Sequence, residues 1–86
     1  MQIQYSKKFK DNLAKLPISA KKQTRNKLEI MYENLKHPSL RTKKIKGTKN
    51  IYESSVNMDT RITWQYVENG ILLRNIGHHD RTLKNH

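Results

Sequence analysis

The fold is decided by residues 61–76, which read RITWQYVENGILLRNI. Polar and apolar side chains alternate from Arg61 to Val67, as they do in a β-strand with one buried face. Asn69-Gly70 separates this run from a second apolar one, and this dipeptide is a strong signal for a two-residue hairpin turn with positive φ at both positions. The stretch therefore predicts two antiparallel strands joined by a tight turn.

A two-residue loop at Asn69-Gly70 would fix which residues lie opposite each other, and opposed residues share a face. In that register Gln65 is paired with Arg74, and Arg61 with His78. The core face is predicted to hold Ile62, Trp64, Tyr66, Ile71 and Leu73. The other face is predicted to hold Arg61, Thr63, Gln65, Arg74 and His78, with Val67, Leu72 and Ile76 among them. We therefore expect the solvent face of the sheet to be cationic and rich in hydrogen-bonding groups.

Two amphipathic helices are predicted before this hairpin. Ser6 is a suitable N-cap, and apolar residues follow it at helical spacing as far as Pro17, namely Phe9, Leu13 and Leu16. Ser19 is a suitable cap for a second helix, which ends at His37-Pro38 because a residue before proline is disfavoured in helical geometry. The residues at helical spacing that would form its buried face are Thr24, Leu28, Met31 and Leu35. The short link between the helices predicts an antiparallel helical hairpin.

Short strands are predicted at residues 2–5, 43–46 and 51–56, the last two around a turn at 47–50. The order of elements is then β-α-α-β-β-β-β. A chain of 86 residues is too short to divide into two cores, so residues 1–86 are expected to form a single domain. The predicted fold class is α+β, with a two-helix hairpin packed on a small antiparallel β-sheet.

The charge is concentrated in the first half of the chain. The net charge is +11, with 14 basic and 3 acidic side chains in residues 1–49 and 4 of each in residues 50–86. A one-sided basic balance favours a polyanionic partner such as nucleic acid, or an acidic protein.

Several classes of protein are excluded by composition. The absence of cysteine excludes disulfides, thiolate zinc sites and a thiol nucleophile. No apolar run is long enough for a membrane span and no secretory segment opens the chain, so a cytoplasmic protein is expected. The three glycines are far apart, which excludes a glycine-rich phosphate loop.

His78-His79-Asp80 is the densest cluster of proton-transfer groups. The alternative is a solvated tail with incidental histidines. A metal site is disfavoured, because adjacent histidines on an extended segment point to opposite faces. Arg61 is suited to binding a phosphate bidentately beside His78, unless it is a strand-end arginine paired with Asp59 or Glu53.

A run of exposed cations is predicted on the first strand pair, consisting of Lys43, Lys44, Lys46 and Lys49. These lysines suit contacts with a phosphate backbone. The alternative is an edge strand on which lysines prevent aggregation. Trp64 and Tyr66 are expected to pack in the core rather than to stack on bases.

These features resemble the RelE/ParE superfamily, the toxin half of bacterial toxin–antitoxin pairs. The resemblance covers nearly the whole chain and rests on KIKG (44–47), IYE (51–53), DTRITW (59–64) and LRNIGHH (73–79). It implies a RelE-like fold and, for RelE-type and YafQ-type members, a ribosome-dependent endoribonuclease that cuts mRNA in the A site without a metal or other cofactor. It also implies a cognate acidic antitoxin, with the toxin monomeric when free and hetero-oligomeric with its antitoxin.

The resemblance also suggests roles for individual residues. Arg61 matches the arginine of the RelE-type strand, His79 falls where YafQ-type toxins have a histidine, and Asp59 falls near their acidic residue. His79 and Asp59 (or Asp80) would then share proton transfer beside His78, with Arg61 on the phosphate and Arg74 among the RNA-binding cations. The chain departs from the RelE-type pattern at Glu53 and Ser55, where lysines are expected, and it lacks the C-terminal tyrosine, with Leu83 near the YafQ-type phenylalanine.

Two other functions remain open at this stage. A ParE-like toxin would inhibit DNA gyrase with the same fold and would not need the histidines. A non-catalytic nucleic-acid-binding domain would explain the charge, although helix-turn-helix spacing is absent.

Overall fold

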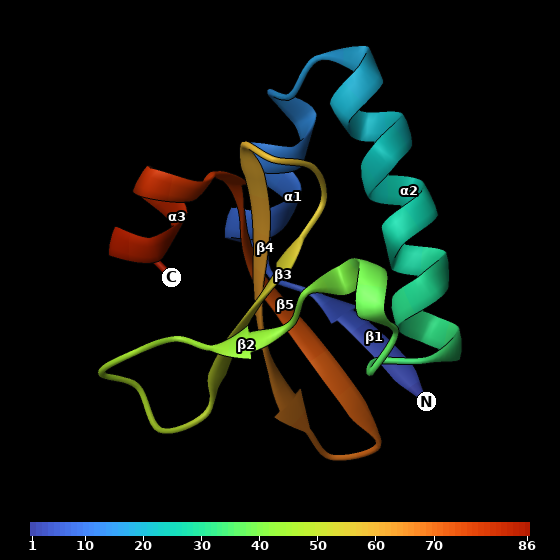
Figure 1. Ribbon diagram of the computed structural model, residues 1–86, viewed down its shortest axis with the longest axis vertical. Coiled ribbons are helices and arrows are strands. Elements are labelled where there is room, and N and C mark those ends of the chain that lie inside the picture. The colour runs from blue at the N-terminus through green and yellow to red at the C-terminus, as the bar shows by residue number, and fades with distance from the viewer.

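The computed structural model describes all 86 residues, which are organised around one five-stranded sheet (Figure 1). The sheet order is β1-β5-β4-β3-β2. The strands are β1 (Gln2–Tyr5), β2 (Lys43–Lys44), β3 (Ile51–Ser55), β4 (Thr60–Val67) and β5 (Gly70–His78). The helices are α1 (Lys7–Ala14), α2 (Ile18–Glu33) and α3 (His79–Lys84), with a 3-10 turn η1 at Pro38–Leu40. The α+β class and the order of the first seven elements are confirmed, whereas α3 was not predicted.

None of these helices has both the length and the apolar character that a membrane crossing requires. The helix α2 ends at Glu33, earlier than the predicted end at His37. Asn34 leaves helical geometry with a φ of −157°, and its Oδ1 accepts a hydrogen bond from the Lys36 N–H at 3.0 Å. An asparagine side chain that bonds the backbone two residues on competes in this way with the helix.

The β4–β5 hairpin is confirmed, but its predicted register is wrong. Val67 is paired with Gly70, so the loop consists of Glu68 and Asn69, and only Asn69 has a positive φ there. A register shift follows, because Trp64 faces Leu73 whereas Thr63 faces Asn75. The residue left over on β5 is Arg74, which makes this a β-bulge.

The bulge changes which side chains face the core. Ile76 was predicted on the solvent face but is 1% exposed, because one extra residue in β5 inverts the alternation that follows it. Tyr66 was predicted in the core but is 54% exposed. Figure 1 shows that the hairpin end of β4 and β5 projects beyond α2, so no helix covers this part of the strand.

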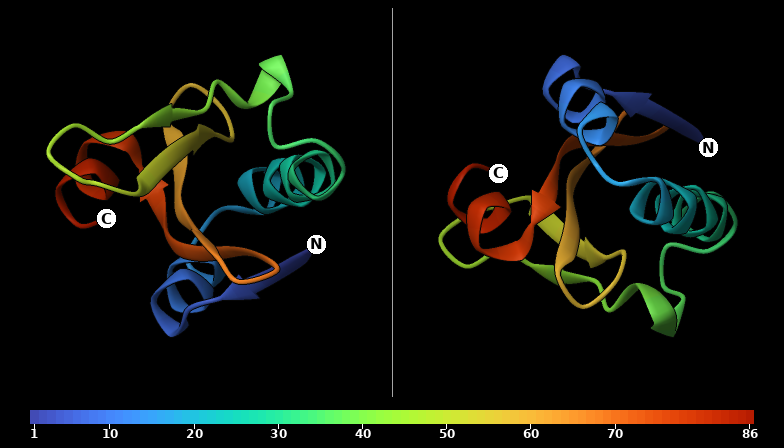
Figure 2. Two further views of the ribbon diagram at one scale, coloured as in Figure 1. Left: turned by 90° about the horizontal axis from the view of Figure 1, so that it is seen from below. Right: turned by 90° about the horizontal axis from the view of Figure 1, so that it is seen from above.

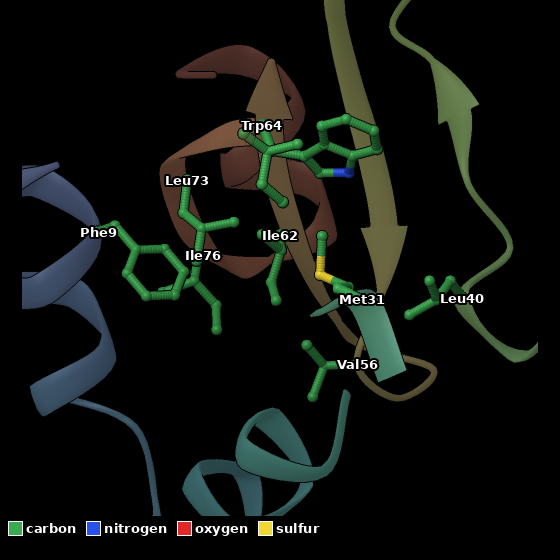
Figure 3. Close-up of a cluster of buried hydrophobic side chains, with 9 residues drawn as sticks. Phe9, Met31, Leu40, Val56, Ile62, Trp64, Leu73 and Ile76 are labelled. Atoms are coloured by element: carbon green, nitrogen blue, oxygen red, sulfur yellow. The ribbon is translucent and has the colours of Figure 1, made fainter. Parts of the chain in front are cut away.

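Helices lie on both sides of the sheet (Figure 2). On one side α1, α2 and η1 contribute Phe9, Met31 and Leu40 to the core, where they pack around Ile62 (Figure 3). The remaining members of this cluster are Val56, Trp64, Ile71, Leu73 and Ile76. On the other side α3 covers the face that was expected to be open to solvent. Its residue Thr82 is 1% exposed, and the Asn75 side-chain amide donates to the Asn85 carbonyl at 2.8 Å.

The sheet is mixed rather than wholly antiparallel, because β1 is parallel to β5. Parallel neighbours need a long crossover, which the chain between β1 and β5 supplies. Ser6 then joins this edge to α1. Its hydroxyl donates to the Arg74 carbonyl at 2.8 Å and accepts from the Phe9 N–H at 3.0 Å, so one side chain caps the helix and contacts the bulge.

The close approach of β1 requires glycine at position 70. A Cβ on Gly70 would lie 1.8 Å from the Gln2 carbonyl oxygen, and backbone atoms cannot move aside as a side chain can. We expect Gly70→Ala to displace β1 and to lower the free energy of unfolding by about 1–3 kcal/mol. Urea unfolding measures this loss, and amide hydrogen exchange over Gln2–Tyr5 locates it.

Gly77→Ala is the matched control, because the nearest atom to its added Cβ is the rotatable Thr82 hydroxyl at 3.1 Å. Its loss of stability should be smaller, with β1 still protected from exchange. Wild-type stability and β1 protection in Gly70→Ala would contradict the pairing of β1 with β5.

Candidate active site

The two histidines are brought together where β5 ends and α3 begins. His78 is the N-cap of α3, and its Nδ1 accepts a hydrogen bond from the Asp80 N–H at 3.3 Å. The imidazole rings of His78 and His79 are stacked, with centroids 4.6 Å apart and an interplanar angle of 28°. The expectation that they point to opposite faces is therefore wrong, because the chain turns into a helix at this point instead of staying extended.

Asp59 joins the histidines from the β3–β4 turn. The His79 N–H donates to the Asp59 carbonyl at 2.7 Å, which ties the start of α3 to this turn. One ligand atom from each side chain of Asp59, His78 and His79 lies within 4.8 Å of the others. Two imidazoles and a carboxylate in this arrangement are suited to proton transfer, and they are also the ligand types that zinc prefers.

Asp80 lies beside both rings. Its carboxylate is 2.9 Å from Nδ1 of His79 and 3.8 Å from Nδ1 of His78. The carboxylate beside Nδ1 of His79 favours the tautomer with its proton on Nδ1, which leaves Nε2 as the acceptor. In His78 the Nδ1 atom accepts from the backbone, which leaves the proton on Nε2. The two rings therefore present one accepting and one donating nitrogen.

Arg61 holds the turn that carries Asp59. Its Nη1 donates to the carbonyls of Asn57 at 2.6 Å, Met58 at 2.9 Å and Thr60 at 3.2 Å. Its Nη2 has no partner within the chain, and the side chain is 21% exposed. Arg61 lies opposite Gly77 rather than His78, because a loop at Glu68-Asn69 shifts the pairing by two residues and the bulge restores only one of them.

The same turn is fixed from within by Asn57. Its Oδ1 accepts hydrogen bonds from the N–H groups of Asp59 at 2.9 Å and Thr60 at 2.8 Å, and its Nδ2 donates to Gln23 at 2.7 Å. The position of Asp59 thus depends on contacts with α2, with Arg61 and with α3.

Glu53 is a buried carboxylate behind this turn. It is 5% exposed, and its Oε1 lies 3.9 Å from Nε of Arg61 and 3.8 Å from Nζ of Lys43. The structure therefore shows the pairing of Arg61 with Glu53 that the sequence left as an alternative to phosphate binding. Lys43 lies beside the same carboxylate. Glu53 also stands where the RelE-type pattern has a lysine, so the cations of this face surround a negative charge.

The predicted RNA-binding lysines are all exposed. Lys46 and Lys49 lie in the β2–β3 loop, which is held by the buried side chain of Ile45 and by the Thr48 hydroxyl donating to the Ile45 carbonyl at 2.7 Å. Arg74 differs from them, because its guanidinium donates to Gln65 and to the His86 carbonyl. The structure thus leaves the four lysines accessible and places Arg74 in contacts between β5, β4 and the C-terminus.

The sequence contained a signal for α3 that the prediction missed. Asp80 lies in the first turn, and Arg81 and Lys84 lie in the last, which is the distribution of charge that a helix dipole favours. Recognising it would have placed both histidines at a helix N-terminus instead of on a tail.

Solved structures share this fold over nearly the whole chain, whereas no family model and no curated protein matches the sequence. One is RelE from Methanococcus jannaschii in complex with RelB, with a TM-score of 0.76, 22% identity and coverage of 92% of this chain and 93% of that one. A second is YafQ from E. coli with DinJ, with a TM-score of 0.74, 11% identity and coverage of 93% and 94%. A third is the YoeB dimer from Staphylococcus aureus, with a TM-score of 0.72, 16% identity and coverage of 92% and 97%. The chain therefore has the RelE-like toxin fold.

Arg61 is expected to contribute to stability as well as to any chemistry. Arg61→Ala removes three hydrogen bonds from a charged donor and leaves Glu53 buried with only Lys43 nearby, so we expect a loss of about 2 kcal/mol in urea unfolding. Arg61→Lys should lose less, because it keeps a charge beside Glu53 but not the planar fork. Lys44→Ala is the control and should unfold like the wild type. An Arg61→Ala protein as stable as the wild type would contradict this role.

Proposed function

We propose that this protein is the toxin of a type II toxin–antitoxin system and acts as a metal-independent, ribosome-dependent mRNA endoribonuclease that inhibits translation. The observation that supports it most is the stacked pair of His78 and His79, with Asp59 and Asp80 beside it. The RelE-like fold and the exposed lysines agree with this function. Its site of action on ribosomes is the cytoplasm.

The reaction needs no metal ion, because RNA carries its own nucleophile. The 2′-oxygen attacks the adjacent phosphorus, a new O2′–P bond forms, and the P–O5′ bond breaks. The proton of the 2′-hydroxyl passes to a base, and the departing 5′-oxygen receives a proton from an acid. The products are a 2′,3′-cyclic phosphate and a 5′-hydroxyl end.

The contacts of the two imidazoles suggest how these roles are divided. Nε2 of His79 accepts the 2′-hydroxyl proton, because Nδ1 faces the Asp80 carboxylate. His78 gives the leaving oxygen its proton from Nε2 as an imidazolium, whose Nδ1–H faces the Asp80 carboxylate 3.8 Å away instead of accepting the bond that caps α3. The Asp59 carboxylate stabilises the imidazolium that forms. Arg61 binds the phosphate through Nη2 while Nη1 holds the turn.

The lysines of β2 and its loop would bind the RNA backbone. Lys43, Lys44, Lys46 and Lys49 are exposed on one segment, and cations of this kind set affinity and position without reading sequence. Arg74 would contribute only if its contacts with Gln65 and the C-terminus open.

Neither gyrase inhibition nor non-catalytic nucleic-acid binding is supported by a structural feature comparable to the histidine and aspartate cluster. Gyrase inhibition by a ParE-like toxin does not require two imidazoles and two carboxylates to converge, and neither does non-catalytic nucleic-acid binding. The convergence of these groups therefore favours the nuclease.

His79→Ala is expected to reduce cleavage about 10²–10⁴-fold, as the loss of a general acid or base does. The measurement is induced expression in bacteria, with growth and newly formed mRNA 5′ ends recorded together. His86→Ala is the control, because only the His86 main chain makes a hydrogen bond. His79→Ala that remains toxic with the same 5′ ends would contradict the role of His79. Growth arrest by the wild type without new 5′ ends would contradict the nuclease itself.

We also infer an acidic antitoxin as the partner. A net charge of +11 on 86 residues repels itself and attracts an acidic chain. RelE was solved with RelB and YafQ with DinJ, which supports such a partner here. A groove of about 780 Å³ between β1, α1 and α2 provides apolar anchors, including Ile3, Leu28 and the 61% exposed Tyr32.

The antitoxin complex should weaken with salt but persist, because charge steers association while apolar contacts are not screened. Titration calorimetry with the acidic protein from the adjacent reading frame measures this dependence. Tyr32→Asp should weaken the complex without unfolding the toxin, since its side chain is exposed. Harmless high-yield expression of the wild type without an antitoxin would contradict the partnership.

A further inference from the structure

A second cleft, far along the sheet from the histidines, is lined by aromatic and cationic side chains. It has a volume of about 350 Å³ and lies between the hairpin end of the sheet and the segment that follows α2. Tyr52, Trp64 and Tyr66 form its sheet side, and Lys36, His37 and Arg41 are its charged or titratable members. No acidic side chain lines it.

The aromatic side of the cleft is rigid and partly open. Tyr52 is stacked on the buried Trp64, with centroids 5.0 Å apart and an angle of 24° between the planes. Tyr66 packs edge-on against both rings at an angle of 79°. It is nevertheless 54% exposed, so part of its ring is free. A ring held by two others loses little side-chain freedom when a ligand stacks on it.

The polar groups around this ring suit a phosphate. Lys44 does not line the cleft, but it is exposed and is paired with the lining residue Tyr52 across β2 and β3, so it shares the face of the aromatic residues. The Nδ1 of His37 accepts from the Ser39 N–H at 3.1 Å, which leaves Nε2 available. The Arg41 side chain makes no hydrogen bond or ion pair within the chain.

Arg41 is also held in an unfavourable backbone conformation. Its φ is +47° and its ψ is +45°, the left-handed region that glycine adopts more easily than arginine. The residue is the C-cap of η1, and its exposed guanidinium is free to contact a ligand.

We propose that this cleft binds an unpaired nucleotide of single-stranded RNA, with the base stacked on Tyr66 and the phosphate held by Arg41 and Lys44. Aromatic faces combined with cations are the recognition elements that single-stranded nucleic acids require. The inference rests on the proposed function, since it assigns a second contact to the same RNA. It differs from the groove beside α2, where Glu29 and Glu33 accompany Lys21 and Arg25 and the lining suits a peptide.

The test is binding of a fluorescein-labelled, fully 2′-O-methylated RNA hexanucleotide, measured by anisotropy at several salt concentrations. This RNA has no 2′-hydroxyl, so binding is measured without cleavage. Tyr66→Leu should weaken binding about tenfold at every salt concentration, because stacking does not release counterions. Tyr66→Phe should bind like the wild type. Tyr32→Leu is the matched control, since it removes an exposed tyrosine outside the cleft and should not change the affinity.

Arg41→Gly separates binding from folding. The slope of log Kd against log salt should fall by about one, as for the loss of one phosphate contact. The melting temperature should stay the same or rise, because glycine relieves the left-handed backbone.

Equal RNA binding by Tyr66→Leu and the wild type would overturn the inference, and so would an equal loss in Tyr32→Leu. Loss of antitoxin binding in Tyr66→Leu with RNA binding intact would assign the cleft to a protein and also overturn it. Failure of the proposed nuclease is recognised separately, by intact cellular mRNA after expression of the wild type.

Discussion

The bulge at Arg74 is the constraint on which the arrangement of this protein depends. One extra residue on β5 turns Ile76 into the core and Asn75 toward α3, and it places Gly77 where Thr82 can pack. It also brings His78 opposite Thr60 at the end of the sheet. The Ser6 hydroxyl contacts the Arg74 carbonyl, so the bulge is also linked to the start of α1. Bulges commonly redirect side chains near functional sites, and here the redirected strand ends at the histidine pair.

The candidate active site is assembled where the β3–β4 turn meets the start of α3. The β3–β4 turn is bonded internally by Asn57 and from outside by Arg61, and its Asp59 carbonyl receives the His79 N–H. The hydrogen bond from His79 to Asp59 joins the β3–β4 turn to the start of α3, so the position of either segment restricts the other. Arg61 thus has a structural role whatever its contact with a phosphate, and the buried Glu53 beside it accounts for part of its orientation.

The large positive charge is divided among surfaces of different chemistry. The lysines of β2 and its loop are exposed, whereas Lys43 also faces the buried Glu53. The groove beside α2 mixes acids with bases and apolar residues, but the cleft at Tyr66 combines aromatic rings with cations alone. A uniform basic surface would bind any polyanion. Under the proposed function, this division assigns RNA and an acidic protein to different parts of the molecule.

The sequence by itself determined the α+β class, the order of strands and helices and most of the core, because apolar periodicity and proline or serine positions act locally. It also identified Asp59, His78 and His79 as candidates from residue type and from resemblance. It could not determine the hairpin register, since Asn69-Gly70 fits two loops equally well until packing decides which side chains are buried. It could not place Tyr66, whose exposure depends on how far the helices extend along the sheet. The tertiary structure alone decided that the two imidazoles lie together, because this requires α3 to pack on β4 and β5 and to bond with the turn at Asp59.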